Sequence, residues 1–310
     1  MFYSIIIPVY NRPVEIDELL ESLVSQTYKE FEVIVVDDGS SVPCSFITDK
    51  YKAVLPIFYY YKANTGPGQT RNFGAEKSKG DYLIFLDSDC VLPENYLISV
   101  EKNIQLHNSV FFGGADRAHH SFTPVQKAIN YSMTSMFTTG GIRGRKKMIG
   151  QYYPRSFNMG VSKKVFEEVG GFSEMRFGED IDLSIRILNC GYESCLFLES
   201  WVYHKRRTDF RKFFKQIFNS GSARINLYKR HPKSLKIVHI FPALFTLGLL
   251  TLPFTWLIYI SYFLLILIDS IIVTRNIVIG VLSVVSSFVQ LFAYGSGFIC
   301  AYTRHLVSHY

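Results

Sequence analysis

Three short apolar runs, each ending in a cluster of polar residues, restrict the possible folds of this chain more than any other feature. They occupy residues 4–10, 31–36 and 82–86, and their length and content of Val, Ile and aromatic residues are typical of buried strands. Apolar residues at helical spacing follow the first run, and a glycine-rich turn opens a second predicted helix at residues 69–77. This alternation predicts an α/β fold with right-handed crossovers and a mostly parallel sheet.

The polar clusters stand at the carboxyl ends of the predicted strands. They are Pro8 to Tyr10, Asp37-Asp38 and Asp87-Ser88-Asp89. Ligands of parallel α/β sheets bind beyond those ends. We therefore expect the three clusters to face one crevice, although they are far apart in the sequence.

The spacing of Asp87 and Asp89 suits a metal site. Two carboxylates on alternate residues can share Mg²⁺ or Mn²⁺, which also binds phosphate oxygens. The same pattern occurs by chance in solvated loops, but its position directly after a buried run favours the metal site.

Asp37, Asp38 and Arg71 each allow two interpretations. An Asp before a glycine is ordinary in turns and helix caps, whereas the functional alternative is a carboxylate that accepts hydrogen bonds from a base or ribose. Arg71 follows the glycine-rich turn, where a guanidinium suits phosphate oxygens or a base carbonyl. The alternative for Arg71 is a solvated surface arginine.

The second half of the α/β region offers two further candidates. Glu179 and Asp180 begin a predicted helix, where an acid often only complements the helix dipole. Asp180 is nevertheless the best candidate in this half for a general base. His204 can complete a metal site begun by Asp89, and the basic residues after it can hold a diphosphate.

The positive charge is concentrated in one block. The chain has a formal charge of +7, and residues 205–236 hold eleven Lys or Arg against one acid, which leaves a net charge of −3 for the rest. Such a block beside a hydrophobic tail indicates a membrane surface rather than a nucleic acid as its partner. The five cysteines lack the paired spacings of a zinc site and suit a reducing cytosol. Residues 1–10 lack the basic region of a signal peptide.

The C-terminal third is typical of a membrane region. Residues 209–218 place Phe and Ile opposite Arg and Lys, which predicts a helix in the bilayer surface, with packing on the domain as the alternative. Residues 237–268 and 276–303 contain no Asp, Glu, Lys or Arg. The first run is too long for one straight span, so it forms a tilted span or a helical hairpin, and the second can span or lie in the interface. The basic block places the preceding domain on the cytoplasmic side.

These motifs together resemble the family 2 glycosyltransferases of the GT-A fold. The matching segments are SIIIPVYNRP, EVIVVDDGS, the run from Asn64 through Cys90, NMGVSKKVFEEVGGF and GEDIDLSIRILNCGY. The resemblance implies an α/β, GT-A-type nucleotide-sugar-binding domain at residues 1–205. A basic amphipathic juxtamembrane segment at 206–236 and two to three membrane-embedded helices within 237–303 would then follow, in the cytoplasmic membrane.

The resemblance also implies a role for each matching residue. Those expected to contact the nucleotide are Pro8, Tyr10, Asp37, Asp38, Arg71 and Asp87, with Arg206 or Arg207 at the leaving diphosphate. Asp89, Asp87 and His204 would hold Mn²⁺ or Mg²⁺, and Asp180 would be the catalytic base.

The implied reaction is transfer of one sugar, with inversion, from a nucleoside-diphosphate sugar to a hydroxyl of a glycan or lipid-linked acceptor. UDP is the default nucleotide and GDP the alternative. The Gln-x-x-Arg-Trp motif of processive synthases is absent, since Ile-Phe-Asn-Ser follows Gln216. A polyprenyl-phosphate sugar synthase is a competing hypothesis, although its phosphate acceptor needs no base and Glu179-Asp180 argues against it. A nucleotidyltransferase and an inactive membrane adaptor are two more hypotheses for this chain.

Overall fold

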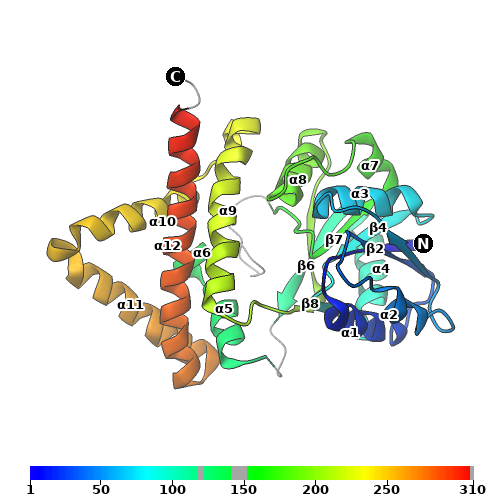
Figure 1. Ribbon diagram of the computed structural model, residues 1–310, viewed down its shortest axis with the longest axis horizontal. Helices are drawn as coiled ribbons and strands as arrows, with labels where there is room; N and C mark the ends of the chain where they lie inside the picture. Colours follow the sequence, from blue (N-terminus) through cyan, green and yellow to red (C-terminus); the bar gives the residue numbers. More distant parts are fainter. Residues whose placement is uncertain (118–121, 141–151, 308–310) are drawn as a thin grey trace. The chain divides into compact units, whose positions relative to one another are not determined.

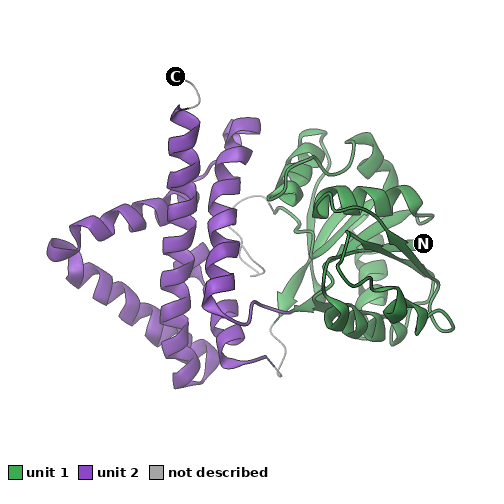
Figure 2. Ribbon diagram, in the orientation of Figure 1, with its two compact units in different colours: residues 1–117, 150–204 green, residues 118–149, 205–310 purple. Residues whose placement is uncertain are grey.

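The computed structural model describes residues 1–117, 122–140 and 152–307, which form two compact units (Figure 2). Unit 1 comprises residues 1–117 and 150–204, and unit 2 comprises residues 118–149 and 205–310. Each unit is thus built from two separate stretches of the chain. The division at residues 205 and 236 that the sequence predicts stays a prediction.

Unit 1 contains an eight-stranded mixed sheet with the order β3-β2-β1-β4-β7-β6-β8-β5 (Figure 1). The strands are β1 (Tyr3–Val9), β2 (Phe31–Asp37), β3 (Ile57–Tyr61), β4 (Tyr82–Leu86), β5 (Cys90–Val91), β6 (Phe111–Arg117), β7 (Asn158–Ser162) and β8 (Cys195–His204). Strands β3, β2, β1 and β4 are parallel neighbours, and β8 is parallel to β6. Strand β7 runs antiparallel to both β4 and β6, and β5 antiparallel to β8. The mostly parallel α/β sheet predicted from the sequence is confirmed.

The parallel half of the sheet is covered on both faces. Successive residues of β1 point to opposite sides, so Ile5 packs in one hydrophobic cluster with Leu19 of α1, and Ile6 packs in the other with Leu183 of α8. Strands buried on both faces have no polar side, which explains why the sequence shows continuous apolar runs instead of alternation.

Helices of unit 1 divide between these two faces. Helices α1 (Pro13–Val24), α2 (Ser45–Asp49) and α4 (Tyr96–His107) contribute to the first cluster. Helices α3 (Pro67–Lys77), α7 (Lys163–Glu168) and α8 (Glu179–Asn189) contribute to the second. Gly74 lets α3 approach the sheet closely, because a Cβ there would lie 2.5 Å from Cγ2 of Ile6.

Most of the parallel half agrees with the sequence analysis, and the antiparallel strands are additions. The three apolar runs are β1, β2 and β4, and the helix expected to begin at Glu179 and Asp180 is α8, which begins at Glu179. The apolar pattern predicts no strand at β7 or β8. Both lie in the part of unit 1 where polar and apolar residues are mixed.

Unit 2 is helical. Its helices are α5 (Pro124–Thr134), α6 (Met136–Thr139), α9 (Phe210–Arg230), α10 (Ile237–Gly248), α11 (Leu252–Thr274) and α12 (Ile277–Val307). Helices α9 and α12 lie side by side (Figure 1), in such close contact that a Cβ on Gly221 would lie 2.1 Å from the carbonyl oxygen of Tyr294. Helix α5 packs on α12, where the hydroxyl of Ser286 donates to the carbonyl oxygen of Ala128 at 2.8 Å.

The aromatic face of α9 corrects one sequence-based hypothesis. Phe213 and Ile217 are buried and pack against Ile129 of α5 and Ala293 of α12. The hypothesis that this face enters the bilayer surface is therefore wrong. The interpretation that holds is that an amphipathic helix buries its apolar face within the protein.

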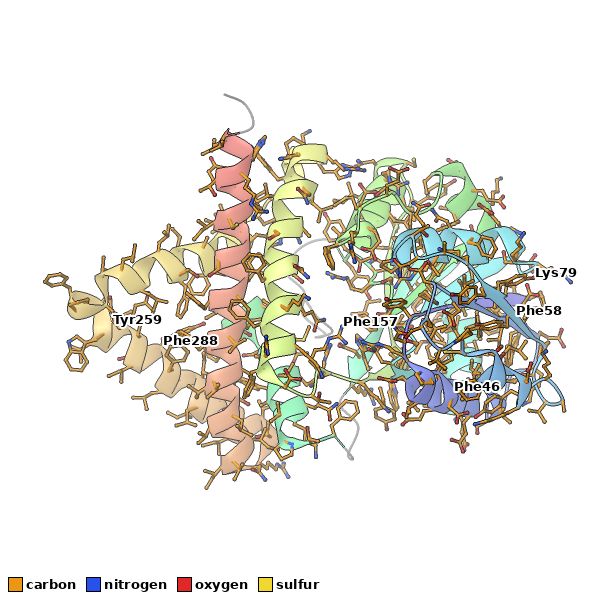
Figure 3. All side chains as sticks on the ribbon, viewed as in Figure 1. Phe46, Phe58, Lys79, Phe157, Tyr259 and Phe288 are labelled. Carbon is orange, nitrogen blue, oxygen red and sulfur yellow. The ribbon has the colours of Figure 1, made fainter. Side chains whose placement is uncertain are left out.

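Two segments of unit 2 are long and apolar enough to cross a membrane by length and composition alone, namely Ile237–Thr274 and Ile277–Val307. The first is not one straight helix, since a 3₁₀ turn at Leu249–Thr251 separates α10 from α11 and the chain reverses there (Figure 1). Tyr259, labelled in Figure 3, belongs to α11, and its hydroxyl donates to the carbonyl oxygen of Phe245 on α10 at 2.9 Å. Of the two arrangements that the sequence allows for this run, the helical hairpin is the observed one.

Candidate functional site

The polar clusters at the ends of β1, β2 and β4 meet at one edge of unit 1, as the parallel pairing requires. Val9 pairs with Asp37 at the last position of the β1–β2 ladder. The β1–β4 pairing aligns Ile6 with Phe85, so Asp87 and Asp89 follow at the same edge. The three polar clusters therefore lie together at one edge of the sheet, where the crevice is expected.

Asp38, directly after β2, binds the loop between β3 and α3. Its Oδ1 accepts hydrogen bonds from Nζ of Lys62 at 2.6 Å and from the backbone N–H of Thr65 at 2.9 Å, and its Oδ2 accepts one from the N–H of Gly66 at 3.0 Å. The side-chain amide of Asn64 donates to the backbone carbonyl of Asp38 at 2.8 Å. The buried Asp38 thus fixes the backbone that leads into α3.

Asp37 holds the turn that follows β2. Its Oδ1 accepts from the N–H of Ser40 at 2.8 Å, and its Oδ2 accepts from the N–H of Cys44 at 3.0 Å and from the hydroxyl of Tyr59 at 2.9 Å. The side chain is fully buried. These bonds give Asp37 a structural role in the turn, whereas its predicted place beside a nucleotide base stays a prediction.

Pro8 and Tyr10 lie on the β1 side of the same edge. Pro8 is half-buried, and Tyr10 is 51% exposed, so its ring is accessible at the end of β1. The next residue, Asn11, has a φ of 52°, in the left-handed region that Asn tolerates better than most residues. Its side-chain oxygen accepts from the N–H of Ser41 at 2.9 Å, which ties the end of β1 to the turn after β2.

Asp89 lies between two cationic or potentially cationic groups. Its Oδ2 accepts a hydrogen bond from Nη1 of Arg12, and its Oδ1 lies 3.2 Å from Nε2 of His204. Strand β5 pairs with β8 so that Cys90 is opposite His204, which explains how residues far apart in sequence meet here. Burial alone would raise the pKa of Asp89, but His204 and Arg12 beside the carboxylate hold it well below its usual range.

The Asp89–His204 pair fits a divalent cation. Within the described residues, Asp89 Oδ1 and His204 Nδ1 are buried atoms without a hydrogen-bond partner. Ligand atoms of Asp89, Cys90 and His204 lie within 4.8 Å of one another. Burial raises the pKa of the Cys90 thiol well above its usual value, so Cys90 stays protonated and offers no thiolate. A carboxylate oxygen and an imidazole nitrogen remain, and these suit Mn²⁺ or Mg²⁺ better than a thiolate-bound metal.

Arg71 links α3 to two acids. Its Nη2 donates to Oδ1 of Asp87 at 2.6 Å, and its Nη1 donates to Oε1 of Glu179 at 3.1 Å. The arginine is 3% exposed and its guanidinium carbon lies 5.5 Å from the ring centroid of Phe172. The interpretation of Arg71 as a solvated surface arginine is therefore wrong. Its ion pairs bring Asp87 and Glu179 to the same place.

Glu179 and Asp180, the first residues of α8, have pKa values that are shifted in opposite directions. Burial and the neighbouring charge of Asp180 raise the pKa of Glu179 to about 7, against the opposing effect of Arg71. Burial also opposes ionisation of Asp180, yet Arg155 and Arg71 hold the pKa of Asp180 below its usual range. Nε of Arg155 donates to Oδ2 of Asp180 at 2.7 Å. At neutral pH, Asp180 is therefore an ionised carboxylate that can accept a proton.

Arg206 and Arg207 belong to unit 2. Arg206 is buried there, and its guanidinium donates to Oδ1 of Asn130 through Nε at 3.2 Å and Nη2 at 3.1 Å. Their expected contact with a diphosphate stays a prediction.

The sequence motifs do not reveal the basic side chains that form ion pairs with the acids. Arg12 binds Asp89, Lys62 binds Asp38, and Arg155 binds Asp180. The sequence showed Arg12 only as part of the turn after the first strand, and the region around Arg155 carries no motif. No motif indicates Phe157 either, although its ring stacks on that of His204 with ring centroids 4.7 Å apart. It is labelled in Figure 3.

Comparison with known proteins gives this geometry a family context. Residues 4–170 match the model of glycosyl transferase family 2. An uncharacterized glycosyltransferase of Haemophilus influenzae is 34% identical over 190 residues, which cover 60% of this chain and 61% of that protein. An uncharacterized glycosyltransferase of Rickettsia felis is 35% identical over 141 residues, which cover 45% of this chain and 22% of that protein. The chain thus spans less than two thirds of the length of these relatives.

The solved structure of a mannosyltransferase from Pyrobaculum calidifontis, in complex with GDP-Man and Mn²⁺, has the same fold. It aligns over 99% of this chain and 87% of its own chain with a TM-score of 0.65 and 14% sequence identity. The GT-A fold expected from the sequence motifs is confirmed.

Proposed function

The chain belongs to glycosyl transferase family 2, and from that premise we propose that it transfers one sugar from a nucleoside-diphosphate sugar to a hydroxyl, with inversion at the anomeric carbon. The donor is a UDP-sugar by default and a GDP-sugar as the alternative. The acceptor is a glycan or a lipid-linked sugar. The observation that carries the proposal is the pair of the buried Asp89 and the partly buried His204, with Oδ1 and Nε2 3.2 Å apart at the carboxyl edge of the sheet.

This pair is the proposed site of Mn²⁺ or Mg²⁺, with Asp87 next to it. When bound, the cation would neutralise negative charge on the diphosphate as it leaves. Arg12 binds Oδ2 of Asp89, which leaves Oδ1 of this carboxylate for the ion. Metal binding would also give a partner to Oδ1 of Asp89, a buried atom without a hydrogen-bond partner among the described residues.

The nucleotide is proposed to lie along the ends of β1 and β2. Tyr10 is accessible for stacking on the base, with Pro8 beside it, and Asp38 is the proposed hydrogen-bond partner of the base, with Asp37 holding the turn behind it. Arg71 is proposed to orient Asp87 towards the ribose, because its Nη2 donates to Asp87. Arg206 or Arg207 is the proposed partner of the departing diphosphate.

Asp180 is the proposed catalytic base. It removes the proton of the acceptor hydroxyl while the oxygen forms a bond to the anomeric carbon and the bond from that carbon to the diphosphate oxygen breaks. The electron pair of the breaking bond leaves with the nucleoside diphosphate. Arg155 keeps Asp180 ionised and orients it, and alignment of the three reacting atoms supplies much of the rate enhancement.

The test measures products and metal binding separately. Purified full-length protein, incubated with Mn²⁺, a panel of UDP- and GDP-sugars and candidate acceptors, should release free nucleoside diphosphate and form a product of inverted configuration. Mn²⁺ titration followed by electron paramagnetic resonance should show a bound ion that Asp89→Ala loses. Release of inorganic pyrophosphate would instead indicate nucleotidyl transfer and refute the proposal.

Two further outcomes identify the competing functions. Transfer to a polyprenyl phosphate that survives Asp180→Asn would identify a polyprenyl-phosphate sugar synthase, because an anionic phosphate needs no base. Tight nucleotide binding with neither transfer nor donor hydrolysis across the acceptors would identify an inactive adaptor.

We also propose that the chain works at the cytoplasmic face of the cytoplasmic membrane. The support is the basic block at residues 205–236 together with the two apolar segments that follow it. Retention of full-length protein in the membrane fraction after salt and carbonate washing is the expected result. Complete release by either wash would contradict membrane embedding.

A further inference from the structure

The hairpin of α10 and α11 is the most exposed apolar part of the chain, and we propose that it enters only one leaflet of the bilayer. In this arrangement the hairpin is re-entrant, α12 lies along the membrane surface, and no helix of the described chain crosses to the other side. The inference rests on the membrane attachment proposed above and is independent of the sugar-transfer chemistry.

The first support is that the hairpin is exposed around most of its circumference near the turn. Within the most apolar window of Ile237–Thr274 only 11% of residues are buried, compared with 44% for Ile277–Val307. Near the turn, Leu250 is 82% exposed and Phe254 91%, and the consecutive residues Leu257 and Ile258 are 60% and 69% exposed. Consecutive helical residues point about 100° apart, and residues 252–254 and 256–258 are all exposed, so the apolar surface covers most of the helix near the turn. Lipid chains cover a helix all round, whereas a protein partner covers one face.

The second support is the distribution of charge. The turn and most of both arms carry no Lys, Arg, Asp or Glu, since the uncharged run extends over residues 237–268. Charged residues stand towards the open ends, where Lys233 before α10 and Arg275 after α11 are exposed. Asp269, near the end of α11, accepts a hydrogen bond from the hydroxyl of Tyr131. Both open ends therefore suit the headgroup region, and the turn suits the hydrocarbon.

The third support is length. Helix α10 has 12 residues, which corresponds to about 18 Å. The 3₁₀ turn of three residues adds roughly 6 Å at most. Helix α11 is longer, with 23 residues, but the turn can lie no deeper than the shorter arm allows. The hydrocarbon core is about 30 Å thick, so the turn does not reach the opposite surface, and it stays within one leaflet when α10 is inclined to the membrane normal.

Helix α12 is long and apolar enough to span, but it is paired with α9, which is long enough and not apolar enough. Its C-terminal half packs tightly on α9, where the hydroxyl of Ser222 donates to the carbonyl oxygen of Gly297 at 3.0 Å and a Cβ on Gly297 would lie 2.1 Å from the carbonyl oxygen of Phe218. The exposed side of α9 carries basic residues near both ends. They are Arg211, Lys212, Lys215, Lys229 and Arg230. If α12 crossed the bilayer, α9 would have to cross beside it with these charges in hydrocarbon.

The exposed face of α12 agrees with a surface position. Val281, Val285 and Phe288, spaced at i, i+4 and i+7, are 52%, 43% and 38% exposed, whereas Ser283 and Ser286 are buried. This is a single apolar stripe, the pattern of a helix that lies in the plane of the interface. A helix surrounded by lipid would expose apolar residues on more than one side.

The test is the side from which single cysteines can be labelled. Cys190→Ser, Cys195→Ser and Cys300→Ser leave only the buried Cys44 and Cys90. In this background, Arg275→Cys marks the corner between α11 and α12, and Phe254→Cys marks the hairpin. A matched protein that keeps the exposed native Cys190 marks the side of unit 1. A membrane-impermeant maleimide is applied to spheroplasts and to inverted vesicles of cells that produce the full chain.

We expect Cys190 and the cysteine at position 275 to be labelled from the same side, and the cysteine at position 254 only after detergent is added. Labelling of position 275 from the side opposite Cys190, or only in detergent, would overturn the inference, because the hairpin would then cross or be immersed to its end. Labelling of position 254 from water without detergent would refute membrane insertion itself. Transfer activity, measured on the same vesicles, reports the proposed function separately.

Depth is measured with Trp256. The chain has two tryptophans, so Trp201→Phe leaves Trp256, near the start of α11 and 50% exposed, as the single fluorophore. We expect lipids brominated along the acyl chain to quench it more strongly than lipids labelled at the headgroup, and iodide to leave it unquenched. Quenching by iodide equal to that of free tryptophan would overturn the inference.

Discussion

Replacement of Glu179 by glutamine tests the electrostatics of the site directly. Glu179 is 7% exposed, its Oε1 accepts from Arg71 at 3.1 Å, and burial and Asp180 raise its pKa to about 7 from the ordinary value of 4.5. Between these two values the folded protein binds more protons than the unfolded chain. The free energy of unfolding therefore falls as pH rises from about 4.5 to 7, and the loss is complete above the folded pKa.

The size of this effect follows from the shift. At about 1.36 kcal/mol per pKa unit, the wild type should lose roughly 3 kcal/mol of stability across this window. Glutamine keeps the carbonyl oxygen that accepts from Arg71 but does not titrate, so Glu179→Gln should lack this loss. For a unit of this size the difference corresponds to a change of roughly 6–12 °C in melting temperature.

The assay is thermal unfolding in detergent at several pH values between the ordinary pKa of a glutamate, about 4.5, and roughly one unit above the folded pKa. The melting temperature of Glu179→Gln relative to wild type should rise with pH over this range, and the largest gain should occur above the folded pKa of about 7. Glu167→Gln, an exposed position on α7, is the control and should leave the pH dependence unchanged. A difference between Glu179→Gln and wild type that is constant over the whole range would refute the reasoning.

Three further predictions concern binding, catalysis and packing. Asp89→Ala should abolish Mn²⁺ binding and lower turnover by roughly 100-fold or more while the protein still folds, whereas full activity after exhaustive chelation would contradict a metal role. Asp180→Asn should lower turnover by about 10²–10⁴-fold while donor affinity, measured by calorimetry, stays within a few-fold, and equal losses in both would indicate a structural role. Gly114→Ala should prevent stable folding, because its Cβ would lie 1.9 Å from the carbonyl oxygen of Ser200, whereas Gly68→Ala, with a nearest approach of 3.3 Å, should fold and melt near the wild-type temperature.

The sequence predicts the parallel half of the sheet well because burial there is complete on both faces. Residues 31–37 of β2 are all buried, so the strand requires a mostly apolar run, and such a run, interrupted by Glu32, is visible in the sequence. Strand β8 is different, since its ten residues alternate irregularly between buried and exposed positions and include Glu199 and Ser200. These residues form a strand because they pair with β6 and β5, which are distant in the sequence. Local pattern carries no information about such pairing.

The amphipathic pattern of α9 locates the helix correctly but indicates the wrong partner for its apolar face. Phe213 and Ile217 are as apolar as a membrane-binding face requires, and the helix does carry basic residues on its other side. The hydrophobic effect does not distinguish lipid chains from the side chains of Ile129 and Ala293. A pattern of apolar residues therefore predicts that a face is buried, but what buries it depends on the tertiary structure.

The acids of the site are more predictable than their cations for a physical reason. Asp37, Asp38, Asp87 and Asp89 stand at strand ends, so a short rigid backbone fixes where each carboxylate begins. Arg12, Lys62 and Arg155 reach their partners through long side chains, and a charged group at the end of such a side chain can be several ångströms from its own Cα in many directions. Position in the sequence therefore predicts where a carboxylate at a strand end lies, but it does not predict where the charged end of a long Arg or Lys side chain lies. The bonds that the acids accept differ in the same way. Asp89 accepts its hydrogen bond from the long side chain of Arg12, whereas Asp38 also accepts from two backbone N–H groups, whose positions the fold fixes.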